Sequence, residues 1–234
     1  LTAESRRYYN DQIDWAVHHA DAILADSQAT RDDLRDRLGV PPERVTVAHL
    51  AASEQFMPLP ETRVRPVMQR YDLHPGYLLF VGVWEPRKNL PGLFKALTIL
   101  RDRGHTRPLV VVGRPGWLYQ EIFDTVAALK LDRAVRFLED VAFEELIAIY
   151  NGAVALVLPS FYEGFGFPAL EAMQCGIPTV VADRASLPEV VGDAGLLIDP
   201  EDPVSIADAC ERILVDAALR AELRDAGLAR ARQF

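Results

Sequence analysis

Two glutamates, Glu163 and Glu171, are separated by seven residues in a segment that also contains the glycines Gly164 and Gly166. Glycine has no Cβ, so a ligand can approach the backbone closely at those two positions. Pro168 suits the first turn of a helix, and a helix N-terminus attracts anions because its unpaired N–H groups carry partial positive charge. Carboxylates repel phosphate but accept hydrogen bonds from hydroxyl groups. A ligand whose phosphate binds these amides and whose hydroxyl groups bind these carboxylates would be a sugar nucleotide.

A strand–loop–helix–strand unit is expected to position these residues. Residues 155–158 form a short apolar run, which is typical of a buried parallel strand. The segment 161–166 contains two glycines and a charge, so it cannot continue that strand. Residues 169–173 are strong helix formers, and a further strand is expected over 179–182.

Two cations, Arg87 and Lys88, lie in a loop that opens at Gly82 and follows a predicted strand over 77–81. Ligands bind outside the carboxyl ends of the strands in open parallel sheets, and the segment 161–166 also follows a strand, so both loops are expected at the same edge. An arginine can bind two phosphate oxygens at once, and a lysine supplies a compact charge. The negative charge of a diphosphate grows as it leaves, so both cations would stabilise the transition state.

Both segments resemble one known family. The sequence PSFYEGFGFPALEAMQCGIPTVV closely resembles the E-x7-E signature of the retaining glycosyltransferases of family 4, which have the GT-B fold. The sequence VGVWEPRKN resembles the VG-x-x-EPRKN segment of mannosyl- and rhamnosyl-type members. The resemblance covers essentially the whole chain, most specifically residues 77–93 and 157–200. It implies transfer of a hexose from a nucleotide sugar to a glycan or lipid acceptor, with retention at the anomeric carbon and with GDP-mannose as the favoured donor.

The resemblance also implies a role for each candidate residue. Glu171 would hold the ribose hydroxyls, and Glu163 the hydroxyls of the donor sugar. Arg87 and Lys88 would neutralise the leaving diphosphate, which would itself take the proton of the acceptor, so catalysis would depend on Glu163, Arg87 and Lys88. The other donor-binding positions implied are the loop residues Gly82, Gly164, Phe165 and Gly166.

Two departures from the family pattern bear on this assignment. Many relatives have an arginine directly after the glycine at position 82, where this chain has Val83, so the cationic task would fall to Arg87 and Lys88. Residues 139–141 read Glu-Asp-Val where relatives often have a Gly-x-Val turn that meets the nucleobase, which leaves the base contacts open.

Strands alternate with helices throughout, which predicts an α/β fold with a doubly wound, Rossmann-like parallel sheet. We expect residues 1–52 to be the end of an incomplete GT-B N-terminal domain, 53–76 an interdomain linker, and 77–234 the donor-binding domain. The linker is rich in proline, and only a short helix is expected there, over 66–71. Ser186, with a glutamate three positions later, matches a capping box.

Composition excludes several other classes. The net charge is −9 and the basic residues are scattered, which argues against a nucleic-acid partner. The two cysteines, Cys175 and Cys210, provide no disulfide framework or zinc spacing, which fits a reducing cytoplasm. The sequence has no D-x-D pair, so we expect no metal and no cofactor besides the donor. No apolar run is long enough for a membrane span.

The chain begins at Leu1, inside an amphipathic helix pattern, so we expect a piece of a longer protein. Acceptor contacts, and any contact with the inner face of the membrane, would belong to its absent N-terminal part. This chain alone would then bind the donor without transferring the sugar.

Two alternatives remain open from sequence. Another GT-B enzyme, such as a nucleotide-sugar epimerase, would release free nucleotide and altered sugar without an acceptor. A non-catalytic sugar-nucleotide-binding module would keep the loops and lack an acceptor domain. A Rossmann dehydrogenase is disfavoured, because no predicted strand is followed by G-x-G-x-x-G.

Overall fold

The computed structural model describes residues 3–234, and the chain divides into two compact units, Leu1–Leu50 and Ala51–Phe234. The smaller unit contains the helices α1 (Ala3–His19) and α2 (Gln28–Leu38), a 3₁₀ turn (Pro42–Arg44), and the parallel strands β1 (Ile23–Ala25) and β2 (Val45–Val47). Both ends of α2 are capped: the Ser27 hydroxyl accepts the N–H of Thr30, and Gly39 adopts φ 64°.

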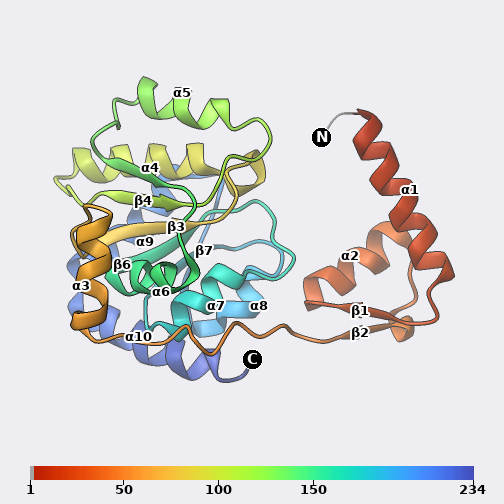
Figure 1. The fold of residues 1–234 in the computed structure, drawn as a ribbon. Helices are drawn as coiled ribbons and strands as arrows, with labels where there is room; N and C mark the ends of the chain where they lie inside the picture. Colours follow the sequence, from red (N-terminus) through yellow and green to blue (C-terminus); the bar gives the residue numbers. More distant parts are fainter. Residues whose placement is uncertain (1–2) are drawn as a thin grey trace. The chain divides into compact units, whose positions relative to one another are not determined.

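The larger unit is built on a six-stranded parallel sheet with the order β5-β4-β3-β6-β7-β8 (Figure 1). Its strands are β3 (Tyr77–Val81), β4 (Leu109–Val112), β5 (Val135–Leu138), β6 (Ala153–Leu158), β7 (Thr179–Ala182) and β8 (Gly195–Ile198). Its helices are α3 (Glu61–Arg70), α4 (Leu90–Asp102), α5 (Gln120–Ala128), α6 (Phe143–Gly152), α7 (Phe167–Gln174), α8 (Leu187–Val191), α9 (Pro203–Val215) and α10 (Ala217–Ala231).

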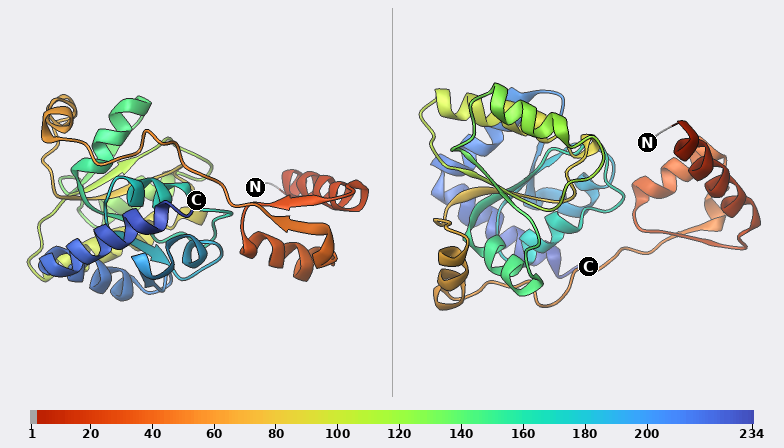
Figure 2. Two further views of the ribbon diagram at one scale, coloured as in Figure 1. Left: turned by 90° about the horizontal axis from the view of Figure 1, so that it is seen from below. Right: turned by 45° about the horizontal axis from the view of Figure 1, so that its top comes forward.

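Helices cover both faces of this sheet (Figures 1 and 2). Helices α4, α5 and α9 lie on one face, where α4 packs on both α5 and α9. Helices α6, α7 and α10 lie on the other face, where α7 packs on α10 and on β6 and β7. The central strands are therefore buried on both sides, which explains why β4 and β7 have no exposed residue. The predicted doubly wound α/β fold is confirmed.

The strand order reverses at the centre of the sheet. From β3 the chain winds outward through β4 to β5, then crosses to the other side of β3 and winds outward again through β6, β7 and β8. The carboxyl ends of β3 and β6 flank this switch point, which is where open α/β sheets bind ligands. The loops that follow β3 and β6 carry Arg87 and Glu163, respectively.

The segment before β3 differs from the sequence prediction. Helix α3 begins at Glu61 rather than at Pro66, so Pro66 lies inside the helix. The proline forfeits one helical hydrogen bond, but the apolar positions of the helix compensate because Val64 and Met68 are buried in the core of the larger unit. Phe56, earlier in the same segment, is buried in that core as well.

Within residues 3–234, no helix has both the length and the hydrophobicity needed to cross a lipid bilayer.

Candidate functional site

Glu163 lies at the centre of a hydrogen-bonded cluster at the switch point. Its Oε1 accepts hydrogen bonds from Lys88 Nζ at 2.6 Å and from Ser160 Oγ at 2.7 Å, and its Oε2 accepts one from Arg87 Nη1 at 2.9 Å. The side chains of Glu163 and Lys88 are only 8% and 9% exposed, whereas that of Arg87 is 38% exposed. The N–H of Phe161 donates to the carbonyl of Arg87 at 2.9 Å, which joins the two loops. The predicted cations and acid thus form one site.

A second carboxylate, that of Glu85, orients Arg87. Glu85 Oε1 accepts from Arg87 Nε at 3.1 Å and from Nη2 at 2.6 Å, and Oε2 accepts the indole N–H of Trp117 at 3.0 Å. Burial acts to lower the pKa of Arg87, but the charges and hydrogen bonds of Glu163 and Glu85 together outweigh it and raise that pKa. Sequence reasoning missed Glu85, although its position two residues before an arginine in the same loop was a usable signal.

Asn89 fixes the cationic loop from the other side. It adopts φ 54° and ψ 38°, in the left-handed region, and its Oδ1 accepts the N–H of Gly92 at 3.2 Å, so Asn89 is the N-cap of α4. Its Nδ2 donates to the carbonyls of Pro159 at 3.1 Å and Pro200 at 2.7 Å. One buried side chain therefore ties three segments together beside Lys88.

The backbone beneath Lys88 is closely packed. Gly82 donates its N–H to Val112 at 2.9 Å, and a Cβ on Gly82 would lie 3.6 Å from the Lys88 side chain. A Cβ on Gly113, at the end of β4, would lie 1.9 Å from the carbonyl oxygen of Gly82. Gly113 is therefore required for the approach of the two backbones.

The glycine-rich loop turns sharply into α7 at Gly166. This residue is the N-cap of α7 with φ 108°, and a Cβ there would lie 2.8 Å from Leu187 Cδ2. Glycine is needed both for the backbone conformation and for this contact. Gly164 is half-buried and Phe165 is buried, with its ring 5.4 Å from that of Phe167.

Ser186 holds this loop in place. The predicted capping box is wrong, because Ser186 has helical φ and ψ and its side chain makes no cap hydrogen bond to α8. Its buried hydroxyl donates instead to the carbonyls of Glu163 and Phe165, each at 2.8 Å. Sequence reasoning missed this contact, which joins residues more than twenty positions apart.

Glu171 lies on α7, and its carboxylate has a different partner. Tyr150 on α6 donates its hydroxyl to Glu171 Oε2 at 2.6 Å. Burial raises the pKa of Glu171, and the hydrogen bond from Tyr150 acts against that shift. Burial, assisted by the Glu171 charge, also raises the pKa of Tyr150 well above its usual value, so the phenol stays protonated and donates.

Asp140, in the loop after β5, adopts φ 51°. Aspartate tolerates the left-handed conformation better than most residues, so this turn forms without a glycine at position 140.

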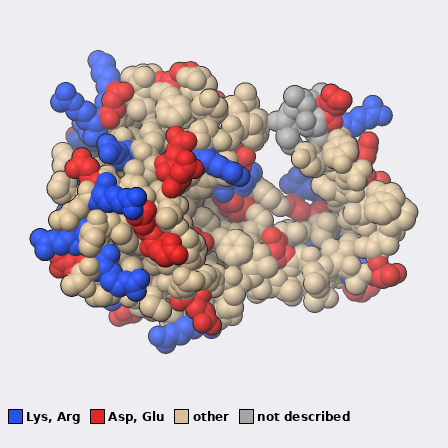
Figure 3. All heavy atoms as spheres, viewed as in Figure 1, with Lys and Arg blue, Asp and Glu red and all other residues tan. Residues whose placement is uncertain are grey.

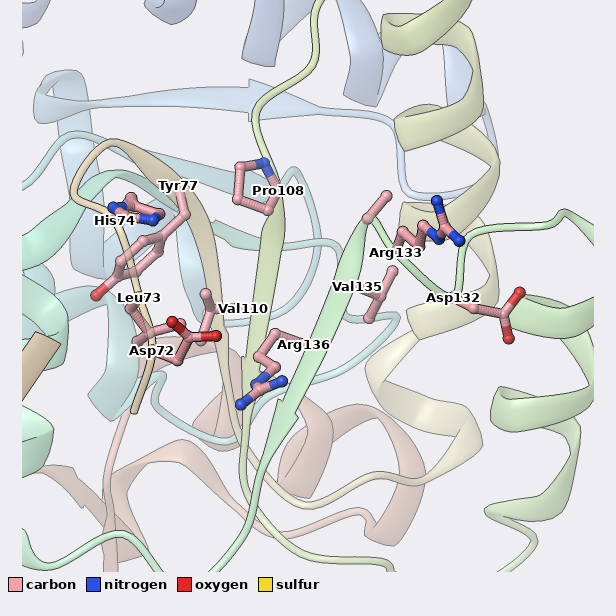
Figure 4. Close-up of a pocket in the computed structure, with 11 residues that line it drawn as sticks. Asp72, Leu73, His74, Tyr77, Pro108, Val110, Asp132, Arg133, Val135 and Arg136 are labelled. Atoms are coloured by element: carbon pink, nitrogen blue, oxygen red, sulfur yellow. The ribbon is translucent and has the colours of Figure 1, made fainter. Parts of the chain in front are cut away.

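A separate hollow of about 350 Å³ lies at the opposite edge of the sheet (Figure 4). It is lined at the amino ends of three strands by Tyr77 of β3, Pro108 before β4 and Val135 of β5, together with charged side chains such as Asp72 and Arg136. It is thus distinct from the loops at the switch point. On the face of the larger unit drawn in Figure 3, basic and acidic side chains are interspersed.

The fold and the site together define a Rossmann-like α/β domain whose charged loops converge at the switch point of the sheet. A family model described as "Glycosyl transferases group 1" matches residues 69–230, and one described as "Glycosyltransferase Family 4" matches residues 2–53. The chain belongs to the glycosyl transferases group 1 family, which confirms the resemblance seen in the sequence.

Individual relatives agree with this assignment. The chain is 38% identical to O-antigen chain mannosyltransferase B of Escherichia coli over 97% of its own length, and it spans 60% of the length of that relative. It superposes on HepE of Anabaena, solved in complex with UDP and glucose, with a TM-score of 0.83 and 21% identity, covering 93% of this chain and 60% of that one. The C-terminal domain of the group 1 protein LpcC from Francisella tularensis gives a TM-score of 0.67 and 23% identity, covering 78% of this chain and 97% of that one.

Proposed function

We propose that this chain is the donor-binding part of a retaining glycosyltransferase, which transfers a hexose from a nucleoside diphosphate sugar to a glycan or lipid-linked acceptor. The observation that carries the proposal is the cluster of Arg87, Lys88 and Glu163 at the switch point of the sheet, next to the N-terminus of α7. Two cations beside a helix N-terminus suit a diphosphate, and a carboxylate within the same cluster suits sugar hydroxyls.

Each residue takes one part of the donor in this proposal. Arg87 and Lys88 bind the diphosphate and stabilise its growing charge as it leaves. Glu163 accepts hydrogen bonds from the sugar hydroxyls, and Glu171 accepts those of the ribose. The backbone from Gly164 to Gly166 contacts the sugar and the phosphate. The departing diphosphate takes the proton of the acceptor, so the reaction needs no nucleophile from the protein and proceeds with retention.

Mannose is the hexose that we propose, with GDP-mannose as the donor. The support is the similarity to O-antigen chain mannosyltransferase B of E. coli, together with the EPRKN segment at 85–89. Transfer requires an acceptor site, which we assign to the part of the protein outside this chain, so the isolated chain binds donor and does not transfer. Three expectations from the sequence stay predictions. They are that the protein needs no metal or other cofactor, that it is located in the cytoplasm, and that any membrane contact is made by the N-terminal part.

Isothermal titration calorimetry of this chain tests the proposal. UDP, GDP and dTDP are titrated first, followed by the matching sugar nucleotides, with Glu163→Ala and Glu171→Ala beside the wild type. Glu145→Ala is a matched control, because Glu145 also accepts a tyrosine hydroxyl at 2.6 Å, but its partners are Tyr71 and Arg70 rather than residues of either loop.

We expect one nucleotide to bind, with GDP favoured. Glu171→Ala weakens the binding of nucleotide and of sugar nucleotide alike. Glu163→Ala removes the extra affinity that the sugar provides, and Glu145→Ala changes neither. A chain that melts cooperatively and binds none of the nucleotides would refute the proposal.

A further inference from the structure

Tyr150 is fully buried, and its hydroxyl, the only polar group of the side chain, donates a hydrogen bond to Glu171. It lies near the end of α6, its relative exposure is 0%, and its hydroxyl is 2.6 Å from Glu171 Oε2. A buried phenol must find an acceptor, because burying an unpaired hydroxyl group is unfavourable. The carboxylate is that acceptor, so the packing of Tyr150 also fixes the direction of the Glu171 side chain.

The ring of Tyr150 is in turn held by the segment that precedes α3. The Phe56 ring packs edge-on against it, with centroids 5.5 Å apart and an interplanar angle of 87°. The neighbouring residue, Asn151, donates to the carbonyl of Met57 at 3.0 Å and accepts the N–H of Leu59 at 2.8 Å. The end of α6 is thus attached to this segment through both Tyr150 and Asn151, which leaves Tyr150 little freedom.

We infer that Tyr150 is a positioning residue for the nucleotide: its hydroxyl holds one oxygen of Glu171, so that the carboxylate is already oriented towards the ribose hydroxyls. The inference rests on the proposed function, which assigns the ribose to Glu171. Tyr150 itself touches no part of the donor. Orientation before binding removes part of the ordering cost that a free glutamate side chain would carry.

The same hydrogen bond has a second effect, which provides a readout. An ionised carboxylate is the better acceptor for ribose hydroxyls, so nucleotide affinity falls as the pH drops through the pKa of Glu171. Burial raises that pKa and Tyr150 opposes the rise, so removal of the hydroxyl raises the pKa further. Cys175, the C-cap of α7, also interacts with Glu171. Burial and the Glu171 charge raise the pKa of Cys175 to about 12, so the thiol stays neutral during the experiment.

The test compares three tyrosine-to-phenylalanine variants of this chain by calorimetric titration with GDP from pH 5 to pH 8. Tyr150→Phe removes the proposed contact. Tyr77→Phe is matched for burial, because Tyr77 is also 0% exposed and donates to the Ile149 carbonyl at 2.6 Å. Tyr71→Phe is matched for chemistry, because Tyr71 donates to the Glu145 carboxylate at 2.6 Å.

We expect Tyr150→Phe to weaken GDP binding about tenfold at neutral pH, which corresponds to about 1.4 kcal/mol. The pH at which affinity is half lost moves upward in this variant and stays in place in both controls. The sugar contribution, measured as the ratio of GDP-mannose to GDP affinity, is unchanged.

Two other outcomes are informative in different ways. If the wild type binds GDP and Tyr150→Phe matches Tyr77→Phe in both affinity and pH profile, the positioning role is refuted and the proposed function stands. If the folded wild type binds no nucleotide, both the proposed function and this inference are refuted.

Discussion

Replacing Glu163 with glutamine should destabilise the larger unit strongly, because it leaves the buried ammonium of Lys88 without a counter-charge. The two side chains are 8% and 9% exposed, and their N···O distance is 2.6 Å. At that distance two unit charges attract by about 6 kcal/mol at an effective dielectric constant of about 20. This attraction offsets the cost of removing both charges from water.

Breaking such a pair from one side costs about 3–5 kcal/mol, and we expect about 3 kcal/mol for Glu163→Gln since its amide oxygen can still accept a hydrogen bond. Lys88→Met should cost less, because Glu163 keeps its ion pair with Arg87 and its hydrogen bond from Ser160. The double variant should cost clearly less than the sum of the two, because it leaves neither charge unpaired. Removing the acid also removes a negative charge beside Arg87, so the affinity for a bare nucleoside diphosphate should not fall in Glu163→Gln.

The assay is denaturant unfolding followed by tryptophan fluorescence. Trp84 is fully buried in the core of the larger unit, whereas Trp15 and Trp117 are 61% and 43% exposed, so Trp84 dominates the signal. Asp208→Asn is the control: its ion pair with Arg103 is 2.7 Å long but exposed, and exposed pairs contribute little. Strictly additive losses for Glu163→Gln and Lys88→Met, or a loss in Glu163→Gln no larger than in Asp208→Asn, would refute the reasoning.

Three further predictions concern single residues. Ser186→Ala should loosen the glycine-rich loop and weaken sugar-nucleotide binding, at a stability cost of about 1 kcal/mol, as measured by calorimetry and by denaturant unfolding. Gly113→Ala should lower the melting temperature sharply, because its Cβ would lie 1.9 Å from the Gly82 oxygen; an unchanged melting temperature would contradict this. Glu171→Gln should flatten the pH dependence of stability: the folded pKa of Glu171 lies above its unfolded value, so the wild type loses stability as pH rises between the two values, and the variant lacks that loss. Melting curves from pH 4 to pH 8 check the last prediction.

The sheet and the cationic loop could be predicted because their signals are local. The strand 77–81 is a continuous apolar run, the strand 179–182 is apolar after Thr179, and Asn89 stands directly before a helix. The convergence of Arg87, Lys88 and Glu163 followed from one general rule, that loops after parallel strands share an edge.

The rest of the site could not be read from the sequence, because it depends on contacts between distant segments. Ser186 matched a local capping pattern, but the position of α8 directs its hydroxyl to loop carbonyls more than twenty residues earlier. Tyr150 looks like any apolar position of an amphipathic helix until α7 places Glu171 beside it. Pro66 indicated the start of a helix, but α3 begins five residues earlier, at Glu61, because Val64 and Met68 are buried in the core.

The three attachments of Asn89 restrict which amino acids that position can accept. Its φ of 54° favours glycine, asparagine and aspartate. Glycine has no side chain with which to reach Pro159, Pro200 and Gly92, and aspartate has no N–H to donate to the two carbonyls. Asparagine alone among the twenty amino acids satisfies the backbone and all three partners. In a saturation-mutagenesis library selected for folding alone, position 89 should therefore tolerate fewer substitutions than position 87, where the arginine side chain is 38% exposed.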